Sequence, residues 1–278
     1  MIVFPNAKIN FGLSITRRRE DGYHDIESWM IPVGWSDVLE IVPAKGAETT
    51  LTVYGRGVDC PLEKNLVMKA YRALNEVVEL PTVDIYLQKI IPDGAGLGGG
   101  SSDAAFTLTA LNELFKLDLD KRQLAEIAAG IGADCPFFVY NRPAAVSGIG
   151  TKMEALESNP LKGQTILIIK PERSVSTKEA YAGVTPAALG IFGGGDGSVI
   201  PEKAEWTKVV KNDFENSVAQ KLPEISQIKS ALYEGGAIYA SMSGSGSAVY
   251  GLFDNDKMAE AARAKFRQMP TYLGRIDK

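Results

Sequence analysis

Apolar and polar residues alternate strictly near the start of the chain. Over residues 7–15 every odd-numbered position is apolar, whereas the even-numbered positions include Lys8 and Asn10. Because successive side chains of a β-strand point to opposite faces, this pattern predicts a half-buried strand with one polar face. Similar reasoning predicts further strands at 38–42, 51–54 and 83–90.

Three segments in the first half of the chain carry apolar residues at helical spacing. In the third, Leu124, Ile127 and Ile131 repeat every three or four residues, and Asp120 can cap the first turn. Strands and helices therefore interleave, and the alternating strands favour antiparallel or mixed sheets over a fully covered parallel sheet. The predicted helices span residues 65–78, 101–115 and 120–131.

The pattern of strands and helices restarts after residue 152. The second run is typical of a small α+β sandwich, so we expect two domains, residues 1–152 and residues 153–278. A glycine-rich stretch at 190–198 is expected to be a flexible loop. The predicted strands of the second run are 165–170, 237–242, 248–253 and a short one near Tyr272, and the helices are 205–219, 224–233 and one from Asp256.

The composition is that of an ordinary globular protein, with 45% of the 278 residues hydrophobic and 23% charged. A formal net charge of −4 provides no basic field for nucleic acid or anionic lipid, so we expect no nucleic acid and no membrane partner. No segment approaches the ~18 apolar residues that span a bilayer. Only Cys60 and Cys135 are present, which is typical of reduced thiols in a cytoplasmic protein, and no cysteine or histidine spacing favours a structural metal.

The stretch IIPDGAGLGGGSSDAAF, residues 90–106, has five glycines within residues 94–100. Consecutive glycines let main-chain N–H groups converge on one point. A helix that begins at Ser101 or Ser102 adds unpaired N–H groups and the positive end of its dipole. The combination predicts a phosphate site, although a linker or a tight turn would also use glycines.

Two known phosphate-loop patterns fit this stretch poorly. A Walker loop needs a lysine before a serine or threonine after the last glycine, and the chain has no lysine there. Gly94, Gly96 and Gly99 satisfy the dinucleotide fingerprint G-x-G-x-x-G, which is weak evidence by itself. The preceding strand alternates and ends at Pro92. The acidic residues about twenty-four positions on, Asp118 and Asp120, lie before a helix and not at the end of a second buried strand, so both features disfavour a dinucleotide fold.

The same stretch resembles the phosphate loop of the kinase superfamily of galactokinase, homoserine kinase, mevalonate kinase and phosphomevalonate kinase. Its GGGSSDAA is similar to the branch that phosphorylates 4-diphosphocytidyl-2-C-methyl-D-erythritol. Three further segments resemble that branch in the same order, so the likeness spans residues 5–253. These segments are PNAKINFGLSITRRREDGYHDIES (5–28), GIGADCPFFV (130–139) and SMSGSGSAVYGLF (241–253).

The resemblance implies a two-domain α+β fold of the homoserine and mevalonate kinase type, with an N-terminal mixed α/β domain and a C-terminal ferredoxin-like α+β domain. It implies transfer of a phosphoryl group from ATP to the substrate's 2-hydroxyl, in the non-mevalonate isoprenoid route. The expected cofactors are ATP and Mg²⁺, the active site is expected between the domains, and the expected assembly is a monomer or homodimer. The residues implied for ATP are Pro92, Gly94, Ala95, Gly96, Leu97, Gly98, Gly99, Gly100, Ser101 and Ser102, and those for Mg²⁺ are Ser102 and Asp103.

The resemblance assigns catalysis to Lys8 and Asp134. Lys8 and Asn10 lie ~7 Å apart on one strand face and can point into one pocket, although a lone lysine there is often a solvated charge. Asp134 is also a candidate cap for the apolar segment that follows it. In the kinase interpretation Asp134 accepts the proton of the attacking hydroxyl, and the Lys8 ammonium keeps that carboxylate ionised, orients it and offsets negative charge.

The remaining candidate residues are assigned to the substrate by the same resemblance. Tyr23 offers an aromatic face to the cytosine, and His24, the only histidine, offers a hydrogen bond to the base edge, although a single histidine is often structural. The turn at 242–247, which is otherwise a hairpin loop, is assigned to the diphosphate end. The full set is Asn10, Tyr23, His24, Ser176, Thr177, Gly244 and Ser245.

Three alternatives remain open at the level of sequence. Another kinase of the superfamily, acting on homoserine or mevalonate, would share the glycine loop without needing Tyr23 and His24. An oxidoreductase would bind NAD and release no ADP. A nucleotide-binding module would bind ATP without turning over any alcohol.

Overall fold

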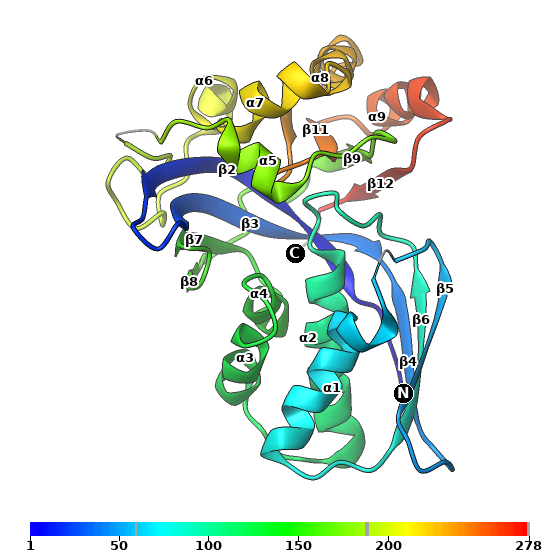
Figure 1. Cartoon of the computed structure of the whole chain (residues 1–278). Coiled ribbons are helices and arrows are strands. Elements are labelled where there is room, and N and C mark those ends of the chain that lie inside the picture. The colour runs from blue at the N-terminus through cyan, green and yellow to red at the C-terminus, as the bar shows by residue number, and fades with distance from the viewer. Residues whose placement is uncertain (59, 187–188, 277–278) are drawn as a thin grey trace. The chain divides into compact units, whose positions relative to one another are not determined.

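The computed structural model (Figure 1) describes residues 1–58, 60–186 and 189–276. Contacts separate the chain into two compact units, each assembled from more than one segment of sequence. These units are defined by contacts and each combines separate parts of the sequence. They therefore do not test the boundary predicted at residue 152, which stays a prediction. The first unit is Met1–Ala7, Trp35–Asp93 and Gly98–Arg142, and the second is Lys8–Gly34, Gly94–Leu97 and Pro143–Lys278.

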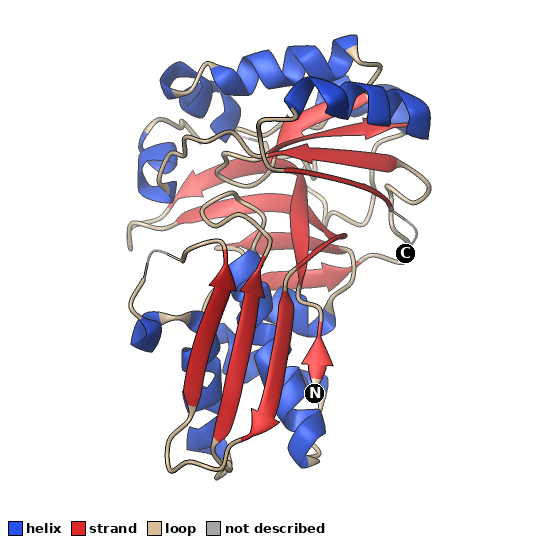
Figure 2. Ribbon diagram, turned by 90° about the vertical axis from the view of Figure 1, so that its right-hand side faces the viewer, coloured by secondary structure: helices blue, strands red, loops and turns tan. Residues whose placement is uncertain are grey.

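The first unit contains a four-stranded sheet and the helices that cover one of its faces. Its elements are β1 (Ile2–Val3), β4 (Val38–Pro43), β5 (Thr50–Gly55), η1 (Leu62–Lys64), α1 (Leu66–Val77), β6 (Val83–Lys89), α2 (Gly99–Phe115), α3 (Lys121–Ala129) and α4 (Cys135–Tyr140). The strand order is β1-β4-β6-β5, and β5 is parallel to β6 while the other pairs are antiparallel. The sheet is therefore mixed, within the prediction. Figure 2 shows its strands side by side in front of the helices.

Side-chain caps fix where two of these helices begin. The Asn65 side chain accepts a hydrogen bond from the Val67 amide at the start of α1. Asp120 and Gln123 form a capping box at the start of α3, which confirms the cap predicted for Asp120. A cap of this kind stabilises a helix by about 1 kcal/mol, because it satisfies backbone N–H groups that the helix leaves open.

The second unit contains two further four-stranded sheets. Its strands are β2 (Asn6–Arg18), β3 (His24–Ser36), β7 (Ala144–Gly148), β8 (Lys152–Ala155), β9 (Thr165–Ile169), β10 (Tyr239–Met242), β11 (Val249–Phe253) and β12 (Thr271–Arg275), with the outer ends of β2 and β3 in the first unit. Its helices are α5 (Thr177–Ala182), η2 (Lys203–Glu205), α6 (Trp206–Val209), α7 (Phe214–Lys221), α8 (Glu224–Glu234), α9 (Asp256–Arg263) and η3 (Ala264–Phe266). The strand orders are β2-β3-β7-β8 and β10-β11-β9-β12.

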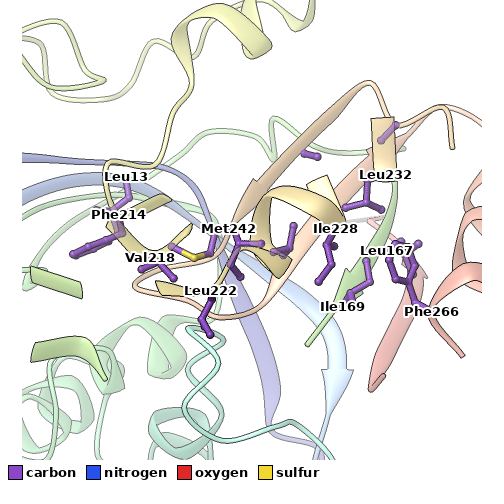
Figure 3. Packing of buried hydrophobic residues seen from close by; sticks show 14 of the residues in the cluster. Leu13, Leu167, Ile169, Phe214, Val218, Leu222, Ile228, Leu232, Met242 and Phe266 are labelled. Atoms are coloured by element: carbon purple, nitrogen blue, oxygen red, sulfur yellow. The ribbon is translucent and has the colours of Figure 1, made fainter. Parts of the chain in front are cut away.

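The main apolar core of the second unit lies between the β10-β11-β9-β12 sheet and the helices that cover it (Figure 3). Leu167 and Ile169 of β9 face Val218 of α7 and Leu232 of α8, and all four are fully buried. Burying one such side chain contributes roughly 1.5–3 kcal/mol.

Among the described residues, no helix combines the length and the apolar character needed to cross a bilayer.

The polar face of β2 is buried, which corrects the prediction of a half-buried strand. Lys8, Asn10 and Ser14 are only 3%, 1% and 5% exposed. Polar groups of the same unit cover this face, among them the Gly96 carbonyl and the Ser243 hydroxyl. Alternation identifies the strand, but it does not say whether its polar side meets water or other polar groups of the protein.

The helix predicted at 205–219 is in fact two helices, α6 and α7, separated by residues 210–213. The backbone between them pairs with β2: the Leu13 amide donates to the Lys211 carbonyl, and the Asp213 amide donates to the Leu13 carbonyl. Hydrogen bonds to a distant strand thus replace those of a continuous helix.

The loop predicted at 190–198 is tied to β3. The Trp29 indole donates to the Gly197 carbonyl at 2.7 Å, and the Phe192 amide donates to the Glu27 carboxylate at 2.9 Å. The sequence analysis did not predict β3 itself, nor β7, β8, α4 and α5. The stretch SWMIPVGW within β3 has apolar residues on both faces and a proline, so neither the strand nor the helix period stands out.

Candidate active site

The glycine-rich stretch is a loop that leads into α2. Gly94, Gly96 and Gly98 have φ angles of 57°, 74° and 72°, a region that residues with side chains rarely adopt. Gly98 is the N-cap residue, so α2 begins at Gly99, two residues before the predicted start. Residues 94–97 of the loop belong to the second unit, and the rest belongs to the first.

The start of α2 has the geometry that a phosphate site requires. The N–H groups of the first turn have no helical carbonyl to bond, and the Gly98 cap supplies no side-chain acceptor. The Ser102 amide is the first to donate within the helix, to the Gly98 carbonyl at 2.9 Å. Open N–H groups and the positive end of the helix dipole favour an anion at this point.

Ser102 and Asp103, the residues predicted near Mg²⁺, are both buried. The Ser102 hydroxyl and the Asp103 Oδ1 atom have no hydrogen-bond partner, while Asp103 Oδ2 accepts from Lys89 at 2.7 Å. No group of three or more acidic, histidine or cysteine side chains among the described residues can hold a metal ion by itself. Magnesium bound through nucleotide phosphates needs few protein ligands. The Ser102 hydroxyl fits that need better than Asp103, because one oxygen of the Asp103 carboxylate is engaged by Lys89.

Lys89 lies between two buried carboxyl groups, those of Asp103 and Asp37. Burial raises the pKa of Asp103 to about 7, while Lys89 opposes the shift and Asp37 adds to it. For Lys89, burial works to lower the pKa, but the two carboxyl groups outweigh this and raise it above its ordinary value. Lys89 is therefore an ammonium group at neutral pH.

Lys8 is held inside the second unit by polar partners. Its Nζ atom donates to Asn10 Oδ1 at 2.5 Å and to the Gly96 carbonyl at 3.1 Å. The Asn10 amide group donates onward to the Ser28 hydroxyl at 2.7 Å. The alternative of a solvated surface lysine is therefore wrong, and the lysine contacts the glycine loop directly.

Ser243, in the turn at 242–247, holds the same loop. Its hydroxyl donates to the Gly96 carbonyl at 2.9 Å and accepts from the backbone amide of Asn10 at 3.1 Å. Two donors, Lys8 and Ser243, thus share one carbonyl oxygen of the loop. The position of the lysine and the conformation of the loop are consequently coupled.

Gly96→Ala is expected to prevent the loop from adopting this shape. An added Cβ would lie 2.0 Å from the Ser243 carbonyl oxygen, whereas at Gly94, which also has a positive φ, it would meet nothing within 4 Å. Gly94→Ala is therefore a control for backbone strain without a clash. We expect Gly96→Ala to lower the thermal midpoint by roughly 5 °C more than Gly94→Ala does, and equal midpoints would contradict this packing.

Tyr181 of α5, which the sequence analysis did not single out, contacts the segment predicted to hold the base. Tyr23 is 63% exposed. His24 stacks on Tyr181, with ring centroids 4.7 Å apart and planes at 27°. Tyr181 in turn meets the edge of Phe214 at 4.8 Å. The sequence could have pointed to Tyr181, because it follows the predicted substrate residue Thr177 by one helical turn.

The other predicted substrate residues differ in how they are engaged. The Ser176 hydroxyl caps α5, because it accepts from the amide three residues on and donates to the carboxylate of the same residue. Thr177 Oγ1 lies 3.2 Å from Ser245 Oγ, so these two hydroxyls are together. A Cβ on Gly244 would lie 3.3 Å from the Gly96 Cα, which places this turn against the glycine loop.

Asp134 stands at the start of α4 in the first unit. It occupies the N-cap position, but its side chain makes no capping hydrogen bond, so the alternative role as a cap is not realised. Its neighbour Cys135 is buried, which raises the pKa of the thiol to about 11, while a hydrogen bond with Ser101 opposes that shift. The Asp134 segment therefore lies against the first turn of α2, and the thiol is a poor nucleophile.

A separate cavity of about 600 Å³ in the second unit contains none of the predicted site residues in its lining. The lining is mainly polar and includes the ion pair of Lys229 with Glu215. Asn212, also in the lining, donates to the carbonyls of Met242 and Gly244 at 2.8 and 2.9 Å. This cavity borders residues that fix the 242–247 turn, but it is not the predicted site.

Comparison with known proteins identifies the family. Residues 65–142 match the family model described as GHMP kinases N terminal domain, and residues 204–270 match GHMP kinases C terminal. The chain is 47% identical to the 4-diphosphocytidyl-2-C-methyl-D-erythritol kinase of Parabacteroides distasonis and 49% identical to that of Bacteroides thetaiotaomicron. Both alignments cover 91% of this chain and 92% of the relative.

Solved structures give the same result. A 4-(cytidine 5'-diphospho)-2C-methyl-D-erythritol kinase superposes with a TM-score of 0.82 at 31% identity, over 100% of both chains. The mevalonate kinase of Methanococcus jannaschii shares the fold, with a TM-score of 0.76 at 14% identity over 100% of this chain and 98% of its own. The predicted α+β kinase fold is confirmed, and the chain belongs to the GHMP kinases, in the family of the 4-diphosphocytidyl-2-C-methyl-D-erythritol kinases.

Proposed function

We propose that the protein transfers the γ-phosphoryl group of ATP to the 2-hydroxyl of 4-diphosphocytidyl-2-C-methyl-D-erythritol. The products are the 2-phosphate and ADP, in a step of the non-mevalonate isoprenoid route. The observation that carries this proposal is the open first turn of α2 behind a glycine loop, in a chain of this kinase family. Phosphoryl transfer depends chiefly on positioning and on charge stabilisation, and both are properties of such a loop.

The backbone of residues 94–102, with Pro92 at its start, binds the ATP phosphates in this proposal. The N–H groups that open the helix take the phosphate oxygens, and glycines leave room for the phosphates to approach the backbone. Ser102 would hold a magnesium ion together with the phosphates, and the bound ion would neutralise part of their charge.

Asp134 is the proposed general base. An alcohol is a weak nucleophile at neutral pH because its proton leaves with difficulty. Asp134 accepts that proton as the 2-hydroxyl oxygen attacks the γ-phosphorus. The new O–P bond forms while the bond from the γ-phosphorus to the bridging oxygen breaks, and the electron pair leaves with ADP. The half-buried carboxylate without a capping role supports this assignment.

Lys8 is the proposed electrostatic partner of the reaction. Its ammonium sits beside the Gly96 carbonyl, so it is fixed relative to residues 94–97 of the phosphate loop. A fixed positive charge stabilises the negative charge that develops on the transferred group. Asn10, which accepts from Lys8, holds the lysine and contributes to the substrate side.

The second unit is proposed to recognise the cytidine and diphosphate parts of the substrate. Tyr23 supplies an aromatic face for the cytosine, and His24, steadied by Tyr181, supplies a hydrogen bond to the base edge. Small residues and hydroxyl groups then meet the diphosphate and the methylerythritol. These are Ser176, Thr177, Gly244 and Ser245.

Tyr23→Ala is expected to raise KM for the cytidylyl substrate by roughly tenfold, because stacking on one aromatic ring is worth about 1–3 kcal/mol per base. The KM for ATP should stay close to the wild-type value. Tyr54→Ala is a matched control, since Tyr54 is also exposed, at 53%, and lies on β5 of the other unit. Steady-state kinetics with each substrate varied in turn make the measurement, and an unchanged KM would remove Tyr23 from the base site.

The decisive test of the function is ADP release by the purified protein with MgATP and the cytidine diphosphate methylerythritol substrate. Homoserine and mevalonate serve as acceptor controls, because the kinases named for them share this fold. Rapid ADP release with the cytidylyl substrate alone is expected. Turnover of homoserine or mevalonate instead would reassign the protein within the superfamily, and nucleotide binding without any turnover would refute the kinase proposal.

We also propose a cellular location, an assembly and a division of roles between domains. Cys60 and Cys135 are both free thiols, which is consistent with a reducing cytoplasm. We propose a monomer or homodimer, with residues 1–152 as the ATP-binding and catalytic domain and residues 153–278 as the substrate-binding domain.

A further inference from the structure

Three charged side chains are buried together in the first unit. Lys89, the last residue of β6, is 4% exposed, and its partners Asp37 and Asp103 are 0% and 2% exposed. The Lys89 Nζ atom donates to Asp37 Oδ2 at 2.5 Å and to Asp103 Oδ2 at 2.7 Å. Buried ion pairs are often no more stabilising than apolar residues of the same size, so stability alone gives a weak reason for this cluster.

One side of the cluster fixes the chain where it enters the phosphate loop. Asp37 Oδ1 accepts hydrogen bonds from the amides of Ile90 and Ile91, at 2.5 and 2.8 Å. These amides immediately precede Pro92, the first residue assigned to the loop. A single carboxylate therefore bonds the Lys89 ammonium through one oxygen and the loop's entry through the other.

The other side of the cluster fixes the chain where it leaves the loop. Asp103 belongs to α2, four residues after the helix begins at Gly99. Lys89 and Ile91 also pack against that first helical residue, because a Cβ on Gly99 would lie 3.3 Å from Lys89 Nζ and 3.0 Å from Ile91 Cγ2. Both ends of the loop are thus joined to one ammonium group.

The loop itself has few means of holding its own shape. Residues 94–100 are five glycines, one alanine and one leucine. Glycine loses more conformational entropy on ordering than any other residue, so a loop ordered only by its ligand would bind that ligand weakly. Fixing both ends before ATP arrives reduces that loss.

We infer that Asp37, Lys89 and Asp103 form an ionic brace that preorganises the phosphate loop, and that they are positioning residues for ATP. The inference rests on the proposed function, since it takes residues 92–102 as the nucleotide loop. It differs from the sequence-based expectation that places Asp103 near Mg²⁺. In the brace, the Asp103 carboxylate acts through Lys89 and touches neither the nucleotide nor the ion.

Two substitutions, Asp103→Leu and Asp103→Asn, distinguish a role of Asp103 in the brace from a role as a Mg²⁺ ligand. Leucine has a similar size but cannot accept from Lys89, and the remaining Lys89–Asp37 pair is balanced in charge, so the variant is expected to fold. Asparagine keeps an oxygen that can accept from Lys89. Glu113→Gln is the control, because Glu113 is an exposed carboxylate on the same helix.

The probe is adenylyl-imidodiphosphate, a non-hydrolysable ATP analogue, titrated with and without Mg²⁺. We expect Asp103→Leu to weaken binding by about tenfold in both conditions, and Asp103→Asn and the control to stay within about threefold of wild type. The KM for ATP should rise in parallel with the analogue dissociation constant, while the KM for the alcohol substrate changes by less than about twofold.

Other outcomes overturn the inference. If both Asp103 variants weaken binding only when Mg²⁺ is present, Asp103 is a metal ligand and not part of a brace. If Asp103→Leu binds the analogue like wild type, or lowers only the thermal midpoint, the cluster is merely structural. If the wild-type protein fails to bind the analogue at all, the proposed function fails first, so the two failures are distinguishable.

Hydrogen exchange on the wild-type protein provides a test that does not depend on any variant folding. The brace requires the amides of Ile90 and Ile91 to be protected before nucleotide is added, because Asp37 already accepts from both. Addition of the ATP analogue should change their exchange little. Rapid exchange without nucleotide, followed by protection on binding, would show that the loop's entry is not fixed in advance.

Discussion

Asp134→Asn is expected to lower kcat by on the order of 100-fold or more, because it removes the proposed general base. The KM for ATP should remain within about twofold of wild type, since the loss falls on the chemical step and not on nucleotide binding. Steady-state ADP release measures kcat, and titration with the ATP analogue measures nucleotide affinity independently.

The control for this substitution is Asp120→Asn. Asp120 also precedes a helix, but there its side chain does cap, and asparagine caps about as well as aspartate. Its kcat should therefore equal that of wild type. Near-normal turnover of Asp134→Asn would remove Asp134 from the role of base, whereas loss of analogue binding would move it to the nucleotide site.

Lys8→Met is expected to lower kcat by roughly 100- to 1,000-fold, because it removes the fixed positive charge that stabilises the transferred group. Methionine fills a similar volume, and Ser243 still donates to the Gly96 carbonyl in the variant. The fold should therefore persist, with a loss of about 1–3 kcal/mol for the hydrogen bonds that Lys8 no longer makes.

Two further variants test whether the effect belongs to the ammonium group at this position. Lys8→Arg should not restore activity, since the larger planar guanidinium has no room in a strand position that is 3% exposed. Lys69→Met removes an exposed lysine from α1 and should leave kcat unchanged. If Lys8→Met keeps more than about a third of the wild-type kcat, electrostatic stabilisation by Lys8 is contradicted.

Local patterns predicted those parts of the fold in which a single element determines its own structure. The alternation of residues 7–15 gave the strand that carries Lys8, and Asp120 marked the start of α3 correctly. The glycines followed by serines located the loop before α2. In each case the signal depends on neighbours in sequence, through side-chain period, capping or backbone freedom.

Local sequence patterns could not predict features that depend on contacts between segments far apart in the chain. The burial of the polar face of β2 and the break at 210–213 both arise from hydrogen bonds with chain segments far away in sequence. Tyr181 becomes a base-site candidate only because the fold stacks it on His24. Lys89 is an ordinary strand residue in the sequence, and only the structure shows its two carboxyl partners.

The carbonyl oxygen of Gly96, which accepts from both Lys8 and Ser243, has a practical consequence for redesign. Positions 8, 96 and 243 should therefore be varied together in a library. Randomising one of them while the others stay fixed would mostly yield inactive clones. Efforts to change which alcohol the enzyme accepts would do better to diversify residues 23–24 and 177–181, and to leave that shared oxygen alone.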